Sequence, residues 1–138
     1  MNELTVVSNE IMNAKENLSV WASFTPETAS EKMALYNALS AKSTNISELM
    51  GKTFRVQNVV FQGREFTNSE TGELEKNLKA IIITDNGIYH SYSRGIINSV
   101  QSILEMFGLP GQWEQPLEFT VERVALKNGG QTFILRGI

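Results

Sequence analysis

Aromatic and basic residues alternate closely in the second part of the chain, between residues 54 and 94. The set comprises Phe54, Arg55, Phe61, Arg64, Phe66, Lys76, Lys79, Tyr89, His90, Tyr92 and Arg94. Flat side chains stack on unpaired bases, and lysine and arginine neutralise the phosphates between them. Because every base offers a face for stacking, this mixture is typical of proteins that bind one nucleic-acid strand of almost any sequence.

Most of this set forms the predicted contact surface for a single strand. The candidate residues are Arg55, Phe61, Arg64, Phe66, Lys76, Lys79, His90, Tyr92 and Arg94. Neighbouring residues on a strand point to opposite faces, so His90 and Tyr92 share one face and Tyr89 and Ser91 the other. We expect His90 and Tyr92 to be exposed. Other aromatic residues are expected to pack in the interior: Trp21, Phe54, Trp113, Phe119 and Phe133.

The same inventory excludes several other kinds of site. The chain has no cysteine, which excludes disulfides, thiolate metal sites and a cysteine nucleophile. Its one histidine, His90, points away from Ser91 on a strand, and no nucleophile-elbow motif is present. Glycine-rich phosphate-binding motifs are absent, and the acidic run at 70–75 lacks the spacing of a calcium loop. We therefore expect a protein without catalytic activity, metal or cofactor.

Length and composition indicate one domain. A chain of 138 residues with 41% apolar residues can bury a core without a metal or disulfide. The longest apolar runs, such as 80–83, are far shorter than a membrane span, and the first residues do not resemble a secretory signal. We therefore expect a cytoplasmic protein with no membrane partner. The net charge of −3 arises within residues 1–50, and residues 51–138 are neutral, so local basic surfaces remain compatible with the acidic total.

Residues 1–50 are predicted to form an N-terminal extension that is helical or irregular. A helix is expected at about 25–42, with Thr25 as its cap and Pro26 at its first position. A stripe recurs at helical spacing and is expected to pack on the later sheet; it comprises Ala29, Met33, Tyr36 and Leu39 or Ser40. Residues 4–7 are consistent with a short strand.

Residues 51–138 are predicted to form a barrel. Alternating and β-rich segments predict strands at 52–62, 78–84, 88–93, 117–126 and 131–138, and residues 96–107 have the period of a helix. Residues 63–77 are polar and are interpreted as a long hairpin loop with its tip near Thr71-Gly72. A helix between the third and fourth of five strands is the order of the OB-fold barrel. A mixed α+β sheet domain with the same order is the alternative.

From Trp21 onwards the chain resembles the single-stranded DNA-binding proteins of Gram-positive phages and related mobile elements. The resemblance lies in the segments WASF (21–24), MALYNA (33–38), the strand at 54–60, TGE (71–73), YSRG (92–95) and FG (107–108). It implies an OB-fold that coats and protects single strands during replication or recombination. Bacterial single-strand binders end in a flexible acidic tail that recruits partners, whereas this chain ends in strand-like residues 135–138. Recruitment through such a tail is therefore not expected.

The sequence thus leads to the hypothesis of a phage or mobile-element protein that binds single-stranded DNA by stacking and phosphate neutralisation. The alternative is a protein-interaction adaptor with the same barrel. Clustering of Arg64, Lys79 and Arg94 beside exposed aromatic residues would favour DNA, whereas dispersal among acids would favour the adaptor. RNA binding, a homo-oligomer, and contacts with phage or host replication proteins stay open.

Overall fold

The structure, a computed structural model, describes residues 3–40 and 43–138. In chain order the elements are α1 (Glu3–Glu16), β1 (Val20–Ala22), α2 (Ala29–Ser40), β2 (Thr44–Asn45), the short 3-10 helix η1 (Ile46–Leu49), β3 (Phe54–Thr67), β4 (Leu74–Thr84), β5 (Gly87–Ser91), α3 (Arg94–Phe107), the 3-10 helix η2 (Pro110–Gln112), β6 (Glu118–Ala125) and β7 (Gln131–Gly137). Among the described residues, no helix is long and apolar enough to cross a membrane.

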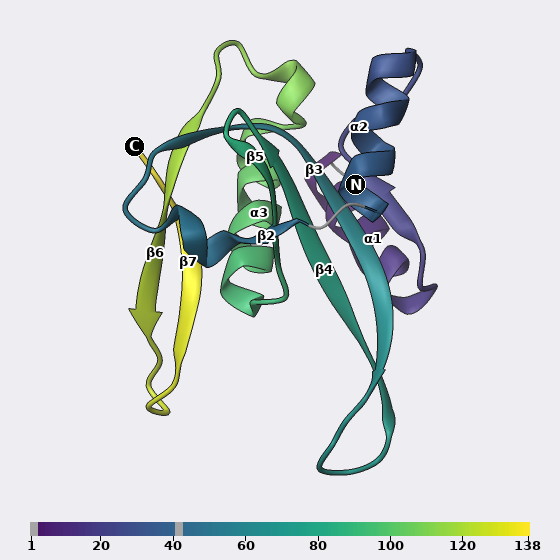
Figure 1. Ribbon diagram of the computed structural model, residues 1–138, viewed down its shortest axis with the longest axis vertical. Coiled ribbons are helices and arrows are strands. Elements are labelled where there is room, and N and C mark those ends of the chain that lie inside the picture. Colours follow the sequence, from purple (N-terminus) through teal and green to yellow (C-terminus); the bar gives the residue numbers. More distant parts are fainter. Residues whose placement is uncertain (1–2, 41–42) are drawn as a thin grey trace.

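The strands form one curled, mixed sheet that makes a half-barrel (Figure 1). Its order is β2-β5-β4-β3-β6-β7, and β1 adds to β3. All pairs of these strands are antiparallel except β2–β5. The long strand β3 pairs with β4 along most of its length and with β6 at Phe54 and Arg55, and its register shifts between Val56 and Asn58. Bulges of this kind bend a strand and increase its twist, which lets β3 join both halves of the sheet. The fold is mainly β with some helices and is consistent with an OB-like barrel.

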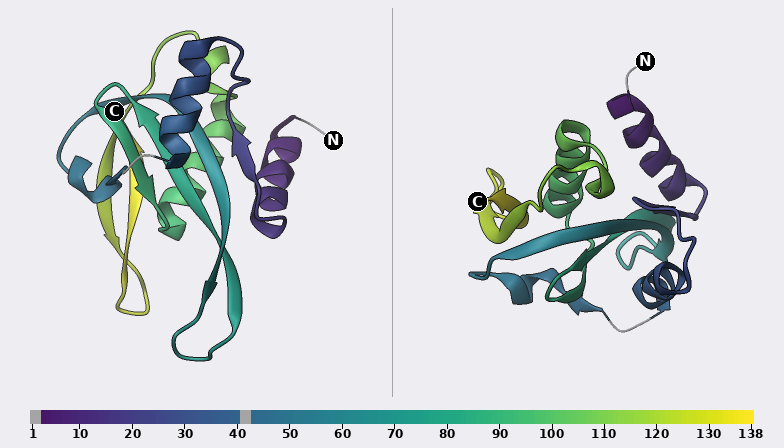
Figure 2. Two further views of the ribbon diagram at one scale, coloured as in Figure 1. Left: turned by 45° about the vertical axis from the view of Figure 1, so that its right-hand side comes forward. Right: turned by 90° about the horizontal axis from the view of Figure 1, so that it is seen from above.

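The helices cover both faces of the sheet. Viewed from above, α1 and α3 lie on one side and α2 lies on the other (Figure 2). The main core lies between the sheet and α3, where Phe61 and Ile82 are buried in the same cluster as Val100. On the opposite face, Ala38 of α2 is buried with Val60 and Ile81. This division follows from the alternation of side chains along β3 and β4, which gives both faces of these strands apolar residues.

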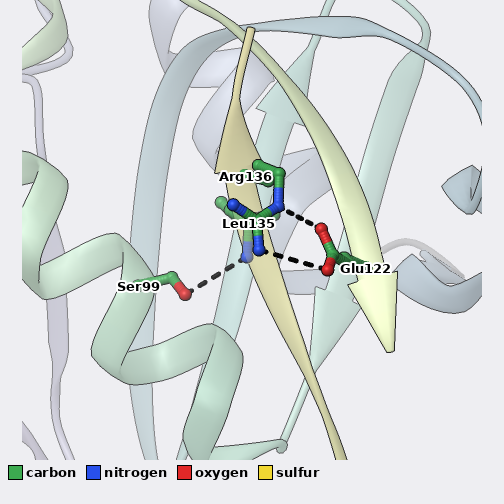
Figure 3. A network of polar contacts seen from close by, with 4 residues as sticks. All are labelled: Ser99, Glu122, Leu135 and Arg136. Atoms are coloured by element: carbon green, nitrogen blue, oxygen red, sulfur yellow. Dashed lines mark hydrogen bonds and ion pairs between the residues drawn. The ribbon is translucent and has the colours of Figure 1, made fainter. Parts of the chain in front are cut away.

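Helix α3 is fixed against β7 by close backbone packing and hydrogen bonding. The backbone N–H of Leu135 donates to the Ser99 hydroxyl at 3.2 Å (Figure 3). A Cβ added at Gly95 would lie 2.2 Å from the carbonyl oxygen of Phe133. Gly108 ends the helix with φ of 81°, and its N–H donates to the carbonyl of Leu104. The helix therefore places its first residue, Arg94, beside the end of β5.

The first residues correct the sequence prediction. A strand was expected at 4–7, but residues 3–16 form helix α1. The buried residues Ile11 and Ala14 attach this helix to the domain. Its end lies so close to β3 that a Cβ at Gly63 would lie 2.1 Å from the Ala14 carbonyl oxygen. Tertiary packing therefore overrides the strand preference of this β-branched segment.

Helix α2 differs from the prediction in its start and in its buried face. Its N-terminus is a capping box at Thr28, in which the N–H of Glu31 donates to the Thr28 hydroxyl at 3.1 Å and the N–H of Thr28 donates to Glu31 Oε1 at 3.0 Å. Prediction placed the cap at Thr25, and the expected end at 42 lies outside the described residues. The predicted buried stripe is correct at Leu39 and wrong elsewhere, because Met33 and Tyr36 are 57% and 64% exposed. Leu35 and Ala38 face the sheet together with Leu39.

The polar segment 63–77 also differs from the expected loop. Strand β3 continues to Thr67 and β4 already begins at Leu74, with Arg64 opposite Asn77 and Phe66 opposite Glu75. Only 68–73 form the turn, and Gly72 has the positive φ of 74° that favours glycine there. The tip is thus where it was predicted. The strands are polar because this part of the hairpin extends beyond the core, so its composition resembles that of a loop.

Candidate nucleic-acid interface

The register of the sheet brings predicted contact residues from three segments onto its outer face. Gln62 lies opposite Lys79 and Arg64 opposite Asn77, and Ile81 lies opposite His90. Directly opposed residues share a face, as do residues two apart on one strand. Arg64, Lys79 and His90 therefore lie on the face that α2 covers further along, at Val60 and Ile81.

Tyr92 follows β5 and lies in contact with this face. Its hydroxyl accepts a hydrogen bond from Nη1 of Arg64 at 2.9 Å. Its ring centroid lies 6.1 Å from that of His90, in an edge-to-face arrangement. Tyr92 is 44% exposed, so a large part of the side chain is available to a ligand. We call Arg64, Lys79, His90 and Tyr92 the Tyr92 surface.

The expected exposure is found for Tyr92, which follows β5, whereas His90 is only partly exposed. Tyr92 is exposed and His90 is half-buried, whereas Ser91 is buried and Tyr89 packs against the main core. Tyr89 thus contributes to packing, and Tyr92 is the exposed member of the tyrosine pair.

His90 contributes a ring to this surface but little positive charge near neutral pH. Partial burial lowers the pKa of His90, and the nearby positive charge of Lys79 lowers this pKa further. A hydrogen bond with Ser43 acts in the opposite direction. The Ser43 hydroxyl lies 2.7 Å from Nδ1 of His90. The positive charge of the Tyr92 surface at pH 7 therefore comes from Arg64 and Lys79.

Lys76 and Arg94 lie beside Tyr92 on a neighbouring groove. This groove has a volume of about 430 Å³, and Lys76, Tyr92 and Arg94 are among its lining residues. Lys76 donates to the backbone carbonyl of Glu16 at 2.7 Å and lies 3.9 Å from the Glu16 carboxylate. Lys15 of α1 also lines this groove and was absent from the predicted set. Lys15 reaches the groove only because α1 packs on β3, and it could not be placed there from the sequence because α1 was not predicted.

Three predicted residues lie away from the Tyr92 surface. Phe61 has no exposed area and packs against Trp21, so it belongs to the core and cannot stack on a base; its prediction as a contact is corrected. Arg55 lies at the opposite end of β3 and pairs with Glu118 at 3.0 Å. Phe66 is 41% exposed on the extended part of the hairpin, two residues beyond Arg64. The structure does not place Arg55 or Phe66 in contact with Tyr92.

Other arginines on the sheet are engaged elsewhere. Arg136 forms an ion pair with Glu122 (Figure 3), and the guanidinium of Arg123 lies 5.6 Å above the ring of Phe133. By contrast, Lys79, Arg94 and Arg64 form no ion pair within residues 3–40 and 43–138. These three cations thus lie near an exposed aromatic ring and have no acidic partner among the described side chains, which is the arrangement that favours DNA over the adaptor.

A curled β domain with an exposed tyrosine among unpaired cations has the features of a nucleic-acid-binding protein. The family model described as phage single-stranded DNA-binding protein, of the phi29 type, matches residues 12–136, and the chain belongs to this family. Family membership indicates binding to single-stranded DNA, and proteins of this family generally bind DNA without catalysing a reaction. Comparison with curated proteins and with solved structures gives no match.

Proposed function

We propose that this protein coats single-stranded DNA during phage or mobile-element replication or recombination inside the bacterial host cell. A base stacks on Tyr92, and Arg64, Lys79 and Arg94 neutralise neighbouring phosphates. The observation that carries the proposal is the open Tyr92 surface, on which Arg64 is hydrogen-bonded to the tyrosine hydroxyl. Stacking requires only a base face, so the binding tolerates many sequences.

We propose further that β3–β7 form a five-stranded OB-fold barrel with α3 between its third and fourth strands, and that residues 1–50 are an extension packed on it. The pairs β3–β4, β4–β5, β3–β6 and β6–β7 support this topology. Within the described residues no ladder joins β5 to β7. Ser93 and Thr132 bridge this gap through their hydroxyl oxygens, which lie 2.8 Å apart.

The proposed binding mode has two consequences for DNA. A protein that binds the unpaired strand and not the duplex shifts the equilibrium towards the melted form by mass action. A strand whose bases and phosphates are covered is also less accessible to nucleases. Both effects need no catalytic group, and the protein acts in proportion to the number of copies bound.

Fluorescence anisotropy of labelled oligo-dT, at low and high salt, tests the proposal against a matched duplex. We expect salt-sensitive binding to the single strand only. Replacing Tyr92 by alanine is expected to weaken binding by about 5- to 150-fold, the equivalent of ~1–3 kcal/mol for one stacked base. Tyr36→Ala is the matched control, because Tyr36 is exposed on α2 away from the Tyr92 surface.

Absence of binding to oligo-dT at low salt would refute the proposed function and return attention to a protein partner. If Tyr92→Ala and Tyr36→Ala had equal effects, the protein would still bind DNA, but the binding surface would lie elsewhere on the molecule. An oligo-rU titration in the same assay measures whether the protein distinguishes RNA from DNA, since the 2′-hydroxyl is the group that differs along the backbone.

A further inference from the structure

We propose that the single strand continues past Tyr92 into the groove between α1, β4 and α3, where Lys15 and Arg94 hold the phosphate of the next nucleotide. This inference rests on the proposed function and adds a binding site outside the sheet. The N-terminal helix then becomes part of the DNA interface and not only a packing element.

The groove has the size and the position that this path requires. Its volume of about 430 Å³ falls within the range of roughly 300–1,000 Å³ that is typical of small-ligand sites. Tyr92 lines the groove and also contacts Arg64 on the sheet face, so the two surfaces are continuous at this residue. A strand stacked on Tyr92 thus lies at the entrance of the groove.

The charge of the groove suits a phosphate. Its lining contains Lys15, Lys76 and Arg94 and no acidic residue, although the whole chain carries a net charge of −3. Lys76 is held by Glu16, whereas Lys15 and Arg94 form no ion pair within the described part of the chain. In another groove, with a volume of about 610 Å³, the situation is the reverse, since its Arg55 is paired with Glu118.

The remaining lining residues suit a nucleoside. Asn98 and Gln101 of α3 provide amide groups that both donate and accept hydrogen bonds, as the edges of the bases require. Met12 and Ile97 provide apolar surface against which a base can pack. Cations, amides and apolar side chains therefore line one groove in the combination that a nucleotide needs.

The position of Lys15 is fixed by the packing of its helix. The preceding residue, Ala14, is buried, and its carbonyl oxygen lies where a side chain at position 63 would be. The backbone of α1 is thereby held against β3 at this point. A cation on a packed helix loses less conformational freedom on binding than one on a loop, which favours its use as a phosphate contact.

Lys15→Gln tests the inference, with Lys32→Gln on the exposed side of α2 as the matched control. Each variant loses one positive charge. For single strands, each neutralised phosphate contributes about −0.7 to the slope of log affinity against log salt. We expect Lys15→Gln to bind oligo-dT more weakly than the wild type at low salt. We also expect its slope of log affinity against log salt to be shallower by about 0.7, so that a fourfold rise in salt weakens its binding about 2.6-fold less than that of the wild type. Lys32→Gln should behave as the wild type.

Lys15→Arg and thermal unfolding separate a phosphate contact from a structural effect. Restored affinity in Lys15→Arg, with an unchanged unfolding temperature in Lys15→Gln, would support the inference. Equal binding by Lys15→Gln and Lys32→Gln, while the wild type binds oligo-dT and Tyr92→Ala weakens it, would overturn the inference and leave the proposed function standing. If the wild type itself did not bind, the proposed function would fail first.

Discussion

At the scale of single residues, the Tyr92 surface combines an exposed tyrosine ring with neighbours that differ in charge: Arg64 and Lys79 are cationic, and His90 carries little positive charge near neutral pH. Arg64 donates to the tyrosine hydroxyl and so holds both side chains in a defined relation. Lys79 supplies charge and simultaneously disfavours the charged form of His90. Alternation predicted the exposure of Tyr92 and that Ser91 points to the opposite face from His90, but not that His90 is half-buried. The Arg64–Tyr92 contact could not be predicted, because it depends on how the β3–β4 hairpin twists over the end of β5.

The lowered pKa of His90 predicts a pH dependence of stability. The unfolded chain binds a proton at His90 near pH 6.5, whereas the folded protein binds it only at lower pH. Between these two pKa values the unfolded state holds more protons, so the free energy of unfolding rises with pH. The contribution of His90 to this free energy is lost as pH falls below about 6.5. Urea unfolding between pH 5 and 7.5 should show this rise in the wild type and a flatter profile in His90→Gln. Identical profiles would contradict the assignment.

At the scale of elements, the patterned segments were predictable and the elements that depend on partners were not. The strand at 117–126 and the helix at 96–107 have clear periods of two and 3.6, and both are present at nearly the predicted bounds. Helix α1 contains β-branched residues early in its sequence and was read as strand, and its burial at Ile11 and Ala14 depends on β3 and α3. The period of α2 is predictable, but its buried face is not: Met33 and Tyr36 are exposed, and Ala38 packs on the sheet between Leu35 and Leu39.

The contact between α1 and β3 predicts the effect of one methyl group. In Gly63→Ala the new Cβ would lie 2.1 Å from the Ala14 carbonyl oxygen, so α1 or β3 must shift. We expect a loss of about 1–3 kcal/mol in the free energy of unfolding, the usual cost of overpacking. Gly111→Ala is the control, because nothing lies within 4 Å of a Cβ there and its φ is not positive. The control should change stability by less than about 0.5 kcal/mol; equal effects of both variants would show that α1 does not depend on this contact.

At the scale of the whole molecule, an acidic chain with a net charge of −3 carries a small basic region. Lys15, Arg64, Lys76, Lys79 and Arg94 lie together around Tyr92, whereas the acidic excess lies in residues 1–50. The net charge alone argues against nucleic acid, whereas the pattern of aromatic and basic residues and their folded arrangement argue for it. The sequence contained the barrel-forming pattern and the aromatic and basic residues, but the helix that completes the groove became apparent only in three dimensions.

This arrangement limits the salt dependence of DNA binding. Five cations that each neutralise one phosphate would give a slope of log affinity against log salt no steeper than about −3.5 for a single strand. Oligo-dT titrations from 50 to 400 mM salt measure this slope. This roughly eightfold range of salt concentration is wide enough to resolve a slope of this size. A steeper slope would require phosphate contacts outside the five residues, and a slope near zero would mean that stacking alone carries the binding.

Helix α2 sets a boundary for the ligand. Because Ala38 packs on Val60 and Ile81, the outer face of the sheet is free on one side of these residues and closed on the other. Under the proposed function, a strand that crosses at Tyr92 would have a short track on each molecule, near the lower end of the roughly 4–16 nucleotides that one OB-fold covers. The number of protein copies needed to cover an exposed strand would then grow in direct proportion to the length of that strand.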